Sequence, residues 1–158
     1  MTFPAEGGCP CGAVRYRLKK PPLFVQCCHC TWCQRETGSA FVINAMIEAR
    51  EVETLAAALE ETPTPSASGA GQIIHRCPTC HVALWSVYSG AGPLFRFVRV
   101  GTLDDPSVAP PQAWIYTSTR QPWLPVPEGM KVFEEYYQRS QHWPAESLAR
   151  RQAVIDGA

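Results

Sequence analysis

The chain has 158 residues, of which 46% are hydrophobic and 18% charged, the balance of an ordinary globular protein rather than a disordered one. Fourteen basic residues offset fourteen acidic residues, which argues against a protein that binds nucleic acid mainly through charge. The length fits one domain, and we expect a single domain over residues 1–158.

The amino terminus, MTFPAEGG, lacks the basic and apolar regions of a secretory signal. The longest apolar run, around Ala40–Ile47, is too short to span a bilayer. We therefore expect a cytoplasmic protein with no membrane partner. In that compartment, clustered cysteines are more often metal ligands or redox groups than disulfides.

Short β-strands dominate the expected secondary structure, since fifteen prolines and eleven glycines are spread along the chain. In Ala13–Leu18, three apolar side chains alternate with two arginines, which is the pattern of a half-buried strand. The runs SAFVINAMI, VALWSVYS, PLFRFVRVG and QAWIYTST are β-branched or aromatic and are bounded by Gly, Pro or Ser. We interpret them as strands as well.

Three other segments are interpreted differently. Residues Ile47–Glu61 are rich in Ala, Leu and Glu and favour a helix by propensity alone, although their apolar positions form no clean helical stripe. Thr62–Gly71 is predicted to be a polar loop. Residues 138–158 are predicted to form a helical tail, with a helix over Pro144–Ile155 and Trp143 as the side chain that docks it.

The eight cysteines form three groups along the chain: Cys9-x-Cys11, Cys27-Cys28-x-Cys30-x-x-Cys33 and Cys77-x-x-Cys80. Short spacing lets two thiolates point at one ion about 2.3 Å away, and soft thiolates select zinc or iron–sulfur centres. One partition joins the first and last pairs into a closed site with four cysteines. Unmetallated buried thiols are the alternative interpretation.

The central group contains three well-spaced thiols with Cys27 directly beside them. Since neighbouring residues of an extended chain point in opposite directions, Cys27 and Cys28 seldom share one metal. Three ligands and an open fourth position are typical of a catalytic zinc, whereas closure by Cys27 or His29 would make a second structural zinc. A thioredoxin-like role for Cys30 and Cys33 would need a strand–CxxC–helix context, which the neighbouring prolines and thiols do not favour.

Six segments in this order resemble the glutathione-dependent formaldehyde-activating enzyme family, also described as the CENP-V/GFA domain: GGCPCGAVRY, CHCTWCQRETGSAF, RCPTCHVALW, VGTLDDP, PPQAWIYTSTRQPWL and EGMKVFEEYY. The similarity runs from about Gly7 to Tyr137. It implies an all-β fold with few short helices, in which several small antiparallel sheets are joined around a structural zinc. It also implies a short turn followed by strands, rather than a helix, over Ile47–Glu61.

The resemblance implies two zinc ions per chain and gives Cys27 no role. It assigns the cysteines to a structural zinc (Cys9, Cys11, Cys77 and Cys80) and a catalytic zinc (Cys28, Cys30 and Cys33). Lyases of this family act on S-(hydroxymethyl)glutathione, the adduct of glutathione with formaldehyde. We therefore expect a zinc-dependent carbon–sulfur lyase whose partner is a small, glutathione-like thiol or thiol adduct. The alternatives are a zinc-stabilised protein-binding module without turnover and a redox or zinc-buffering protein.

Several side chains beside the central cysteines could assist them. Thr37, Gly38 and Ser39 follow the last ligand and either hydrogen-bond a bound ligand or only shape the turn into the next strand. His29 is expected to point away from the metal. Glu36 is either a general base or an exposed charge.

Farther along the chain, Arg120 and Trp123 are candidates to bind an anionic thiol. The alternative is that Arg120 is a surface residue and Trp123 a core residue. Two positions depart from the family pattern. His81 stands where the family usually has glycine, and we expect it to adopt a positive φ, as histidine does more readily than most residues. Arg76 stands where an aromatic residue is common.

Overall fold

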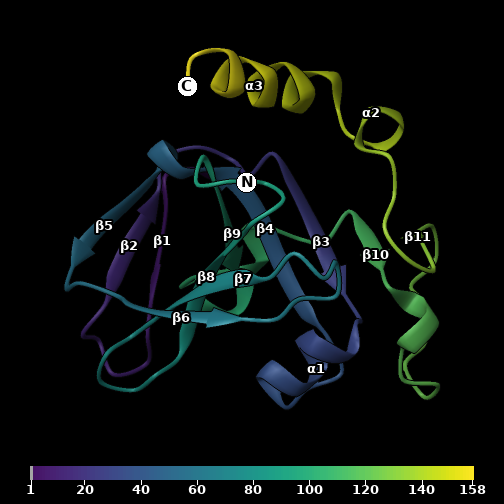
Figure 1. Cartoon of the computed structure of the whole chain (residues 1–158), viewed down its shortest axis with the longest axis horizontal. Coiled ribbons are helices and arrows are strands. Elements are labelled where there is room, and N and C mark those ends of the chain that lie inside the picture. The colour runs from purple at the N-terminus through teal and green to yellow at the C-terminus, as the bar shows by residue number, and fades with distance from the viewer. Residues whose placement is uncertain (1) are drawn as a thin grey trace.

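The computed structural model describes residues 2–158, which form two β-sheets with helices at the edges (Figure 1). One sheet has three strands in the order β1-β2-β5, and the other has eight in the order β11-β10-β3-β4-β9-β8-β7-β6. The strands are β1 (Ala5–Gly8), β2 (Arg15–Leu18), β3 (Phe24–Cys28), β4 (Val42–Glu48), β5 (Val52–Ala56), β6 (Glu60–Thr64), β7 (Gln72–Arg76), β8 (Ala83–Tyr88), β9 (Phe95–Arg99), β10 (Ala113–Ile115) and β11 (Lys131–Val132). The predicted mainly-β fold is therefore confirmed.

The helices are few and mostly short. They are α1 (Thr31–Thr37), α2 (Arg139–His142) and α3 (Ala145–Asp156), with 3₁₀ turns at η1 (Ala49–Glu51), η2 (Val100–Thr102), η3 (Pro106–Val108) and η4 (Thr117–Thr119). None of the helices in the described chain is long and apolar enough to cross a bilayer.

Most strand pairs are antiparallel, and β10 is the exception because it runs parallel to both β3 and β11. The alternation in the second strand is confirmed, because Val14, Tyr16 and Leu18 are fully buried while the two intervening arginines reach acidic partners. Arg15 binds Asp104, and Arg17 binds Glu6. The sheet thus buries one face of β2 and exposes the other.

The helix favoured by propensity over Ile47–Glu61 does not form. This segment contains the end of β4, the turn η1, strand β5 and the start of β6. Strand β5 pairs with β2, with Val52 opposite Leu18, so backbone partners in the three-stranded sheet outweigh a weak local helix preference. The predicted loop Thr62–Gly71 is also partly wrong, because Thr62–Thr64 belong to β6 and pair with β7.

Two of the contacts that hold the carboxyl-terminal tail against the large sheet come from Trp143 and Arg150. Trp143 is buried and stacks on Phe24 of β3, with 5.4 Å between ring centroids. Arg150 of α3 forms two hydrogen bonds, of 3.0 and 2.7 Å, with the buried carboxylate of Glu48. Helix α3 runs across the end of the sheet opposite α1 (Figure 1).

Candidate functional site

Two hairpin turns bring four cysteines together. Cys9 and Cys11 lie between β1 and β2, and Cys77 and Cys80 lie between β7 and β8. The four sulfur atoms lie within 4.8 Å of one another, and the Cys9–Cys11 and Cys11–Cys77 pairs are 3.3 and 3.7 Å apart. Sulfur ligands about 2.3 Å from a tetrahedral zinc are about 3.8 Å apart. The cluster therefore has the dimensions of a zinc site that links the two sheets.

Each turn of this cluster contains a residue with positive φ directly after its second cysteine. Gly12 has φ 77° and His81 has φ 59°, so the expected conformation of His81 is confirmed. Backbone N–H groups then reach the sulfurs: Val14 N lies 3.2 Å from Cys9 Sγ and Thr79 N lies 3.4 Å from Cys77 Sγ. Such donors favour the thiolate form that a metal requires.

The central cluster consists of Cys28, Cys30 and Cys33, whose sulfur atoms also lie within 4.8 Å of one another. Cys28 ends β3, Cys30 is the N-cap of α1, and Cys33 lies in the first turn of that helix. All three residues are 5–6% exposed. The strand end and the helix start thus converge on one point.

Cys27 and His29 lie outside the central cluster. Because β3 is extended through both Cys27 and Cys28, their side chains point to opposite faces. The Cys27 sulfur lies 3.4 Å from His29 Nε2, and the imidazole packs 4.4 Å from the ring of Trp114. His29 points away from the cluster, as expected. Neither residue is placed to supply a fourth ligand.

The expectation about the surroundings of Cys30 and Cys33 is wrong, because strand β3 ends just before them, Cys30 caps helix α1 and Cys33 lies in its first turn. Hydrogen bonding from Cys28, followed by that from Cys33, lowers the pKa of the Cys30 thiol to about 3 in the absence of metal. The backbone N–H of Cys33 also points at the Cys30 sulfur, at 3.4 Å. The cluster therefore carries a thiolate at Cys30 at neutral pH.

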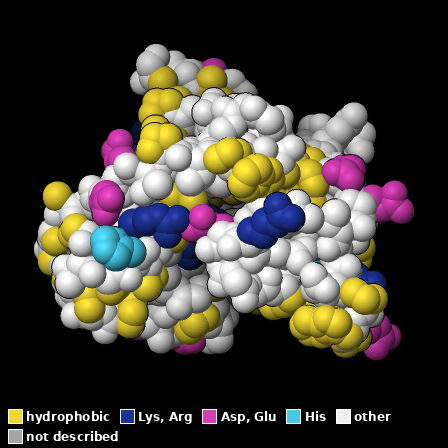
Figure 2. All heavy atoms as spheres, turned by 60° about the horizontal axis from the view of Figure 1, so that its bottom comes forward, with side chains coloured by type: hydrophobic (Ala, Val, Ile, Leu, Met, Phe, Trp, Pro, Cys, Tyr) yellow, Lys and Arg dark blue, Asp and Glu magenta, His cyan; other side chains and the backbone are white. Residues whose placement is uncertain are grey.

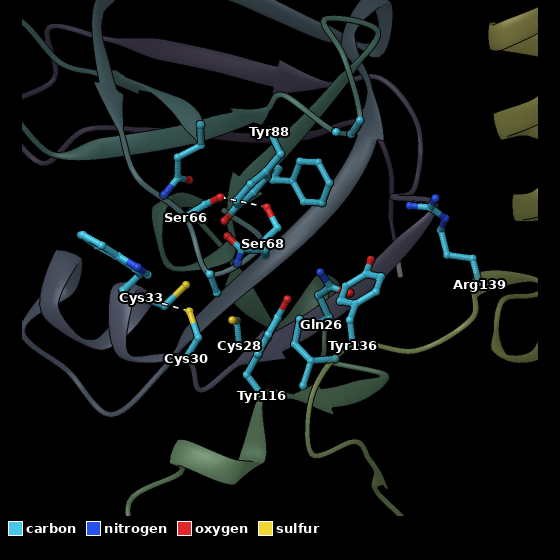
Figure 3. Close-up of a pocket in the computed structure, with 18 residues that line it drawn as sticks. Gln26, Cys28, Cys30, Cys33, Ser66, Ser68, Tyr88, Tyr116, Tyr136 and Arg139 are labelled. Atoms are coloured by element: carbon cyan, nitrogen blue, oxygen red, sulfur yellow. Dashed lines mark hydrogen bonds between the residues drawn. The ribbon is translucent and has the colours of Figure 1, made fainter. Parts of the chain in front are cut away.

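All three central cysteines line a pocket of about 360 Å³ (Figure 3). Its other lining residues are Gln26, Trp32, Asn44, Ser66, Ala67, Ser68, Gln72, Tyr88, Gly90, Ala91, Phe97, Ile115, Tyr116, Tyr136 and Arg139. In Figure 3 the sulfur atoms lie at one side, Arg139 comes from the tail at the other, and Tyr116 and Tyr136 lie between them. A small molecule in this pocket can thus contact the sulfurs and a guanidinium at once.

Sequence reasoning missed Tyr116, Tyr136 and Arg139. Tyr116 has left-handed backbone angles, φ 55° and ψ 41°, which are unusual for a residue with a Cβ and which tend to occur at functional positions. Burial, followed by the charges of Cys28 and Cys30, raises the pKa of its hydroxyl. Tyr116 therefore remains protonated and can donate a hydrogen bond.

The residues after Cys33 shape the turn at the end of α1. The Thr37 hydroxyl donates to the Cys33 carbonyl at 2.8 Å, and Gly38 supplies φ 63° at the end of the helix. Thr37 and Ser39 line a second hollow of about 470 Å³, not the cysteine pocket. Glu36 lines the same hollow and pairs with Arg76, so it is neither a free base nor a solvated charge. Figure 2 shows histidine, basic and acidic side chains adjoining on the face that contains α1.

Arg120 and Trp123 do not line the cysteine pocket. Arg120 donates to the carbonyl oxygens of Gln121 and Leu124, whereas Trp123 is 69% exposed and so is not a core residue. The cation in the pocket is Arg139, which comes from the tail.

The donor chemistry of both clusters fits zinc. Each offers only thiol sulfurs, the soft ligands that zinc prefers, and each holds them within the span of one ion. The clusters differ in ligand number and in surroundings, since four cysteines can close a coordination shell and three cannot. The three-cysteine cluster is the one that lines the 360 Å³ pocket.

Comparison with known proteins identifies one family. The sequence profile described as "Glutathione-dependent formaldehyde-activating enzyme" matches residues 4–119. No curated protein matches the chain significantly. Among solved structures, a protein from Rhodobacter sphaeroides, titled only as a structural genomics target, is 18% identical. That match covers 81% of this chain and 98% of the other, with a TM-score of 0.48.

Proposed function

Because the chain belongs to the glutathione-dependent formaldehyde-activating enzyme family, we propose that it is a zinc-dependent carbon–sulfur lyase. Its substrate would be the formaldehyde adduct of a carboxylate-bearing thiol, such as S-(hydroxymethyl)glutathione. The observation that supports this most directly is the position of Cys28, Cys30 and Cys33 on the wall of a pocket. The family match covers the three cysteines, although the tail residue Arg139 lies beyond it.

The three cysteines would hold the metal of this lyase. A zinc ion bound there would supply a Lewis acid with one position left for a substrate sulfur. The chain prepares the ligands by keeping Cys30 as a thiolate and by directing the Cys33 N–H toward it. Each of the three cysteines is only 5–6% exposed, so protein covers most of its surface and a ligand would reach it through the pocket.

Tyr116 is the residue we assign to the oxygen of the substrate. In the direction of addition, a thiol and formaldehyde join through a new C–S bond while the carbonyl electron pair moves onto oxygen, which takes up the thiol proton. The protonated Tyr116 hydroxyl can stabilise charge that develops on this oxygen, and it can do the same in the reverse, lyase direction.

Arg139 is the residue we assign to a carboxylate of the thiol. It is half-buried in the pocket wall, and within residues 2–158 its guanidinium has no ion-pair partner. A guanidinium in this setting favours a carboxylate bound through two hydrogen bonds. Tyr136, Ser66 and Ser68 add polar groups along the pocket.

A second candidate function is supported by the surroundings of Cys30. A cysteine with a lowered pKa at the start of a helix, three residues from another cysteine, is typical of a thiol–disulfide redox site. The third thiol, Cys28, favours metal binding over this alternative. Reversible formation of a Cys30–Cys33 disulfide in zinc-loaded protein would favour the redox function.

The test is exchange between free and thiol-bound ¹³C-formaldehyde, followed by NMR with zinc-loaded protein and glutathione. The wild type should accelerate exchange above the uncatalysed rate, and Cys30→Ser should abolish the acceleration together with about one equivalent of zinc. Tyr116→Phe should reduce it about 10- to 100-fold with zinc content unchanged. No acceleration by protein carrying two zinc ions would reject the lyase function.

Comparison of two thiols tests the role of Arg139. Arg139→Gln should raise the KM for glutathione about tenfold and leave that for neutral 2-mercaptoethanol unchanged, because only glutathione carries a carboxylate. Arg120→Gln is the matched control, since Arg120 does not line the pocket. An equal effect of Arg139→Gln on both thiols would contradict the assignment.

A further inference from the structure

Three polar side chains form a row across the centre of the large sheet. Gln26 on β3 lies opposite Asn44 on β4, and Asn44 lies opposite Arg99 on β9. Directly paired residues of antiparallel strands point to the same face of a sheet. Cys28 is two residues beyond Gln26 and so shares that face. The row therefore connects the pocket wall to Arg99.

Arg99 is a buried cation, since it is only 6% exposed. Its guanidinium donates to Asn44 Oδ1 and, at 2.8 Å, to the hydroxyl of Ser86. Within the described residues 2–158, however, no carboxylate forms an ion pair with it. A buried charge without an opposite charge destabilises a fold, so the countercharge of Arg99 requires an explanation.

The central cysteines lie within electrostatic range of this guanidinium. Asn44 accepts a hydrogen bond from the guanidinium and lines the same pocket as the three cysteines. Phe97, two residues before Arg99 on β9, shares its face of the sheet and also lines that pocket. Both residues place Arg99 next to the pocket that the three cysteines line.

We propose that Arg99 is a positioning residue whose buried positive charge balances the negative charge of the zinc-loaded three-cysteine site. Three thiolates around one Zn²⁺ leave a net charge of −1, which matches the single charge of the guanidinium. Through its hydrogen bond, Arg99 also fixes Asn44 on the pocket wall. This inference rests on the proposed function, because it requires zinc at Cys28, Cys30 and Cys33.

The test is the zinc affinity of the central site, measured by competition with a chelator of known affinity. Arg99→Gln should lose about tenfold in affinity, while Arg99→Lys, which keeps the charge, should stay within about threefold of wild type. Ser86→Ala is the matched control: it removes a hydrogen bond from the guanidinium but leaves the charge, and it should also stay within about threefold. The zinc at the four-cysteine site should be unaffected in every variant. Thiolate-to-metal absorption of Co²⁺-loaded protein verifies that three sulfurs still bind.

Two outcomes would overturn the role of Arg99 alone: wild-type affinity in Arg99→Gln, or an equal loss in Arg99→Gln and Arg99→Lys. If Arg99→Gln does not fold, a tenfold loss in Arg99→Lys or Ser86→Ala still contradicts charge balance. Wild-type protein that binds no zinc at the central site would overturn the inference and the proposed function together. The wild-type measurement thus separates the two failures.

Discussion

Replacement of Trp143 by alanine tests how the tail is attached to the pocket. The indole is 6% exposed, stacks on Phe24, and donates its N–H to the Tyr137 hydroxyl at 2.8 Å. Tyr137 in turn donates to Gln26 on the pocket wall at 3.0 Å. Truncation of a buried tryptophan costs about 3–5 kcal/mol, so Trp143→Ala should lower the free energy of unfolding by about 4 kcal/mol. Urea unfolding with a slope of about 2 kcal/mol per molar should show a midpoint lower by about 2 M.

Two further variants separate the aromatic contact of Trp143 from its hydrogen bond, and both from the effect of losing an exposed tryptophan. Trp143→Phe keeps an aromatic ring against Phe24 but removes the N–H donor, and it should cost about 1–2 kcal/mol. Trp123→Ala is the control, because that indole is 69% exposed and its loss should change stability by less than about 0.5 kcal/mol. If Trp143→Ala and Trp123→Ala gave equal midpoints, the docking of the tail through Trp143 would be refuted.

Three more predictions concern the cysteines and their neighbours. Cys27→Ser should keep two zinc ions per chain while Cys30→Ser loses about one, as measured by elemental analysis; equal loss would indicate that Cys27 is a ligand. After removal of the central zinc, alkylation of Cys30 should be nearly constant between pH 5 and 8, since a pKa of about 3 leaves it a thiolate throughout. A cysteine of ordinary pKa would instead react several hundredfold faster at pH 8 than at pH 5. His81→Gly should raise the free energy of unfolding by about 1 kcal/mol, because glycine adopts φ 59° without strain, and a decrease measured by urea unfolding would contradict this.

The sequence predicted the parts of the fold that local pattern controls. The alternation in Ala13–Leu18 indicated β2, because only one face of that strand is buried. Amino-acid composition wrongly favoured a helix over Ile47–Glu61, where the pairing of β5 with β2 decides the conformation. The resemblance to a family predicted strands there, because the family pattern includes this tertiary context.

The parts of the site whose residues are close in sequence could be predicted. The parts that the fold assembles from distant segments could not. Cysteine spacing indicated both clusters, but the pocket combines β3, β8, β10 and the tail, so nothing local marks Tyr116 or Arg139 as its lining. Trp32 was overlooked although it lies between two of the cysteines. In the sequence, nothing distinguishes Arg99 from an ordinary strand residue, because its burial and its lack of an ionic partner are properties of three-dimensional packing.

The order of zinc release tests most directly whether the three-cysteine site is open. A mild chelator is titrated into protein carrying two zinc ions while zinc release and circular dichroism are followed, with and without glutathione. We expect one zinc to leave first from a chain that stays folded, because the four-cysteine site joins the turns of two sheets and the central site has one protein ligand fewer. Glutathione should slow this first release by occupying the fourth position of the central zinc. Simultaneous loss of both metals with unfolding, or a release rate that does not respond to glutathione, would contradict an open three-cysteine site.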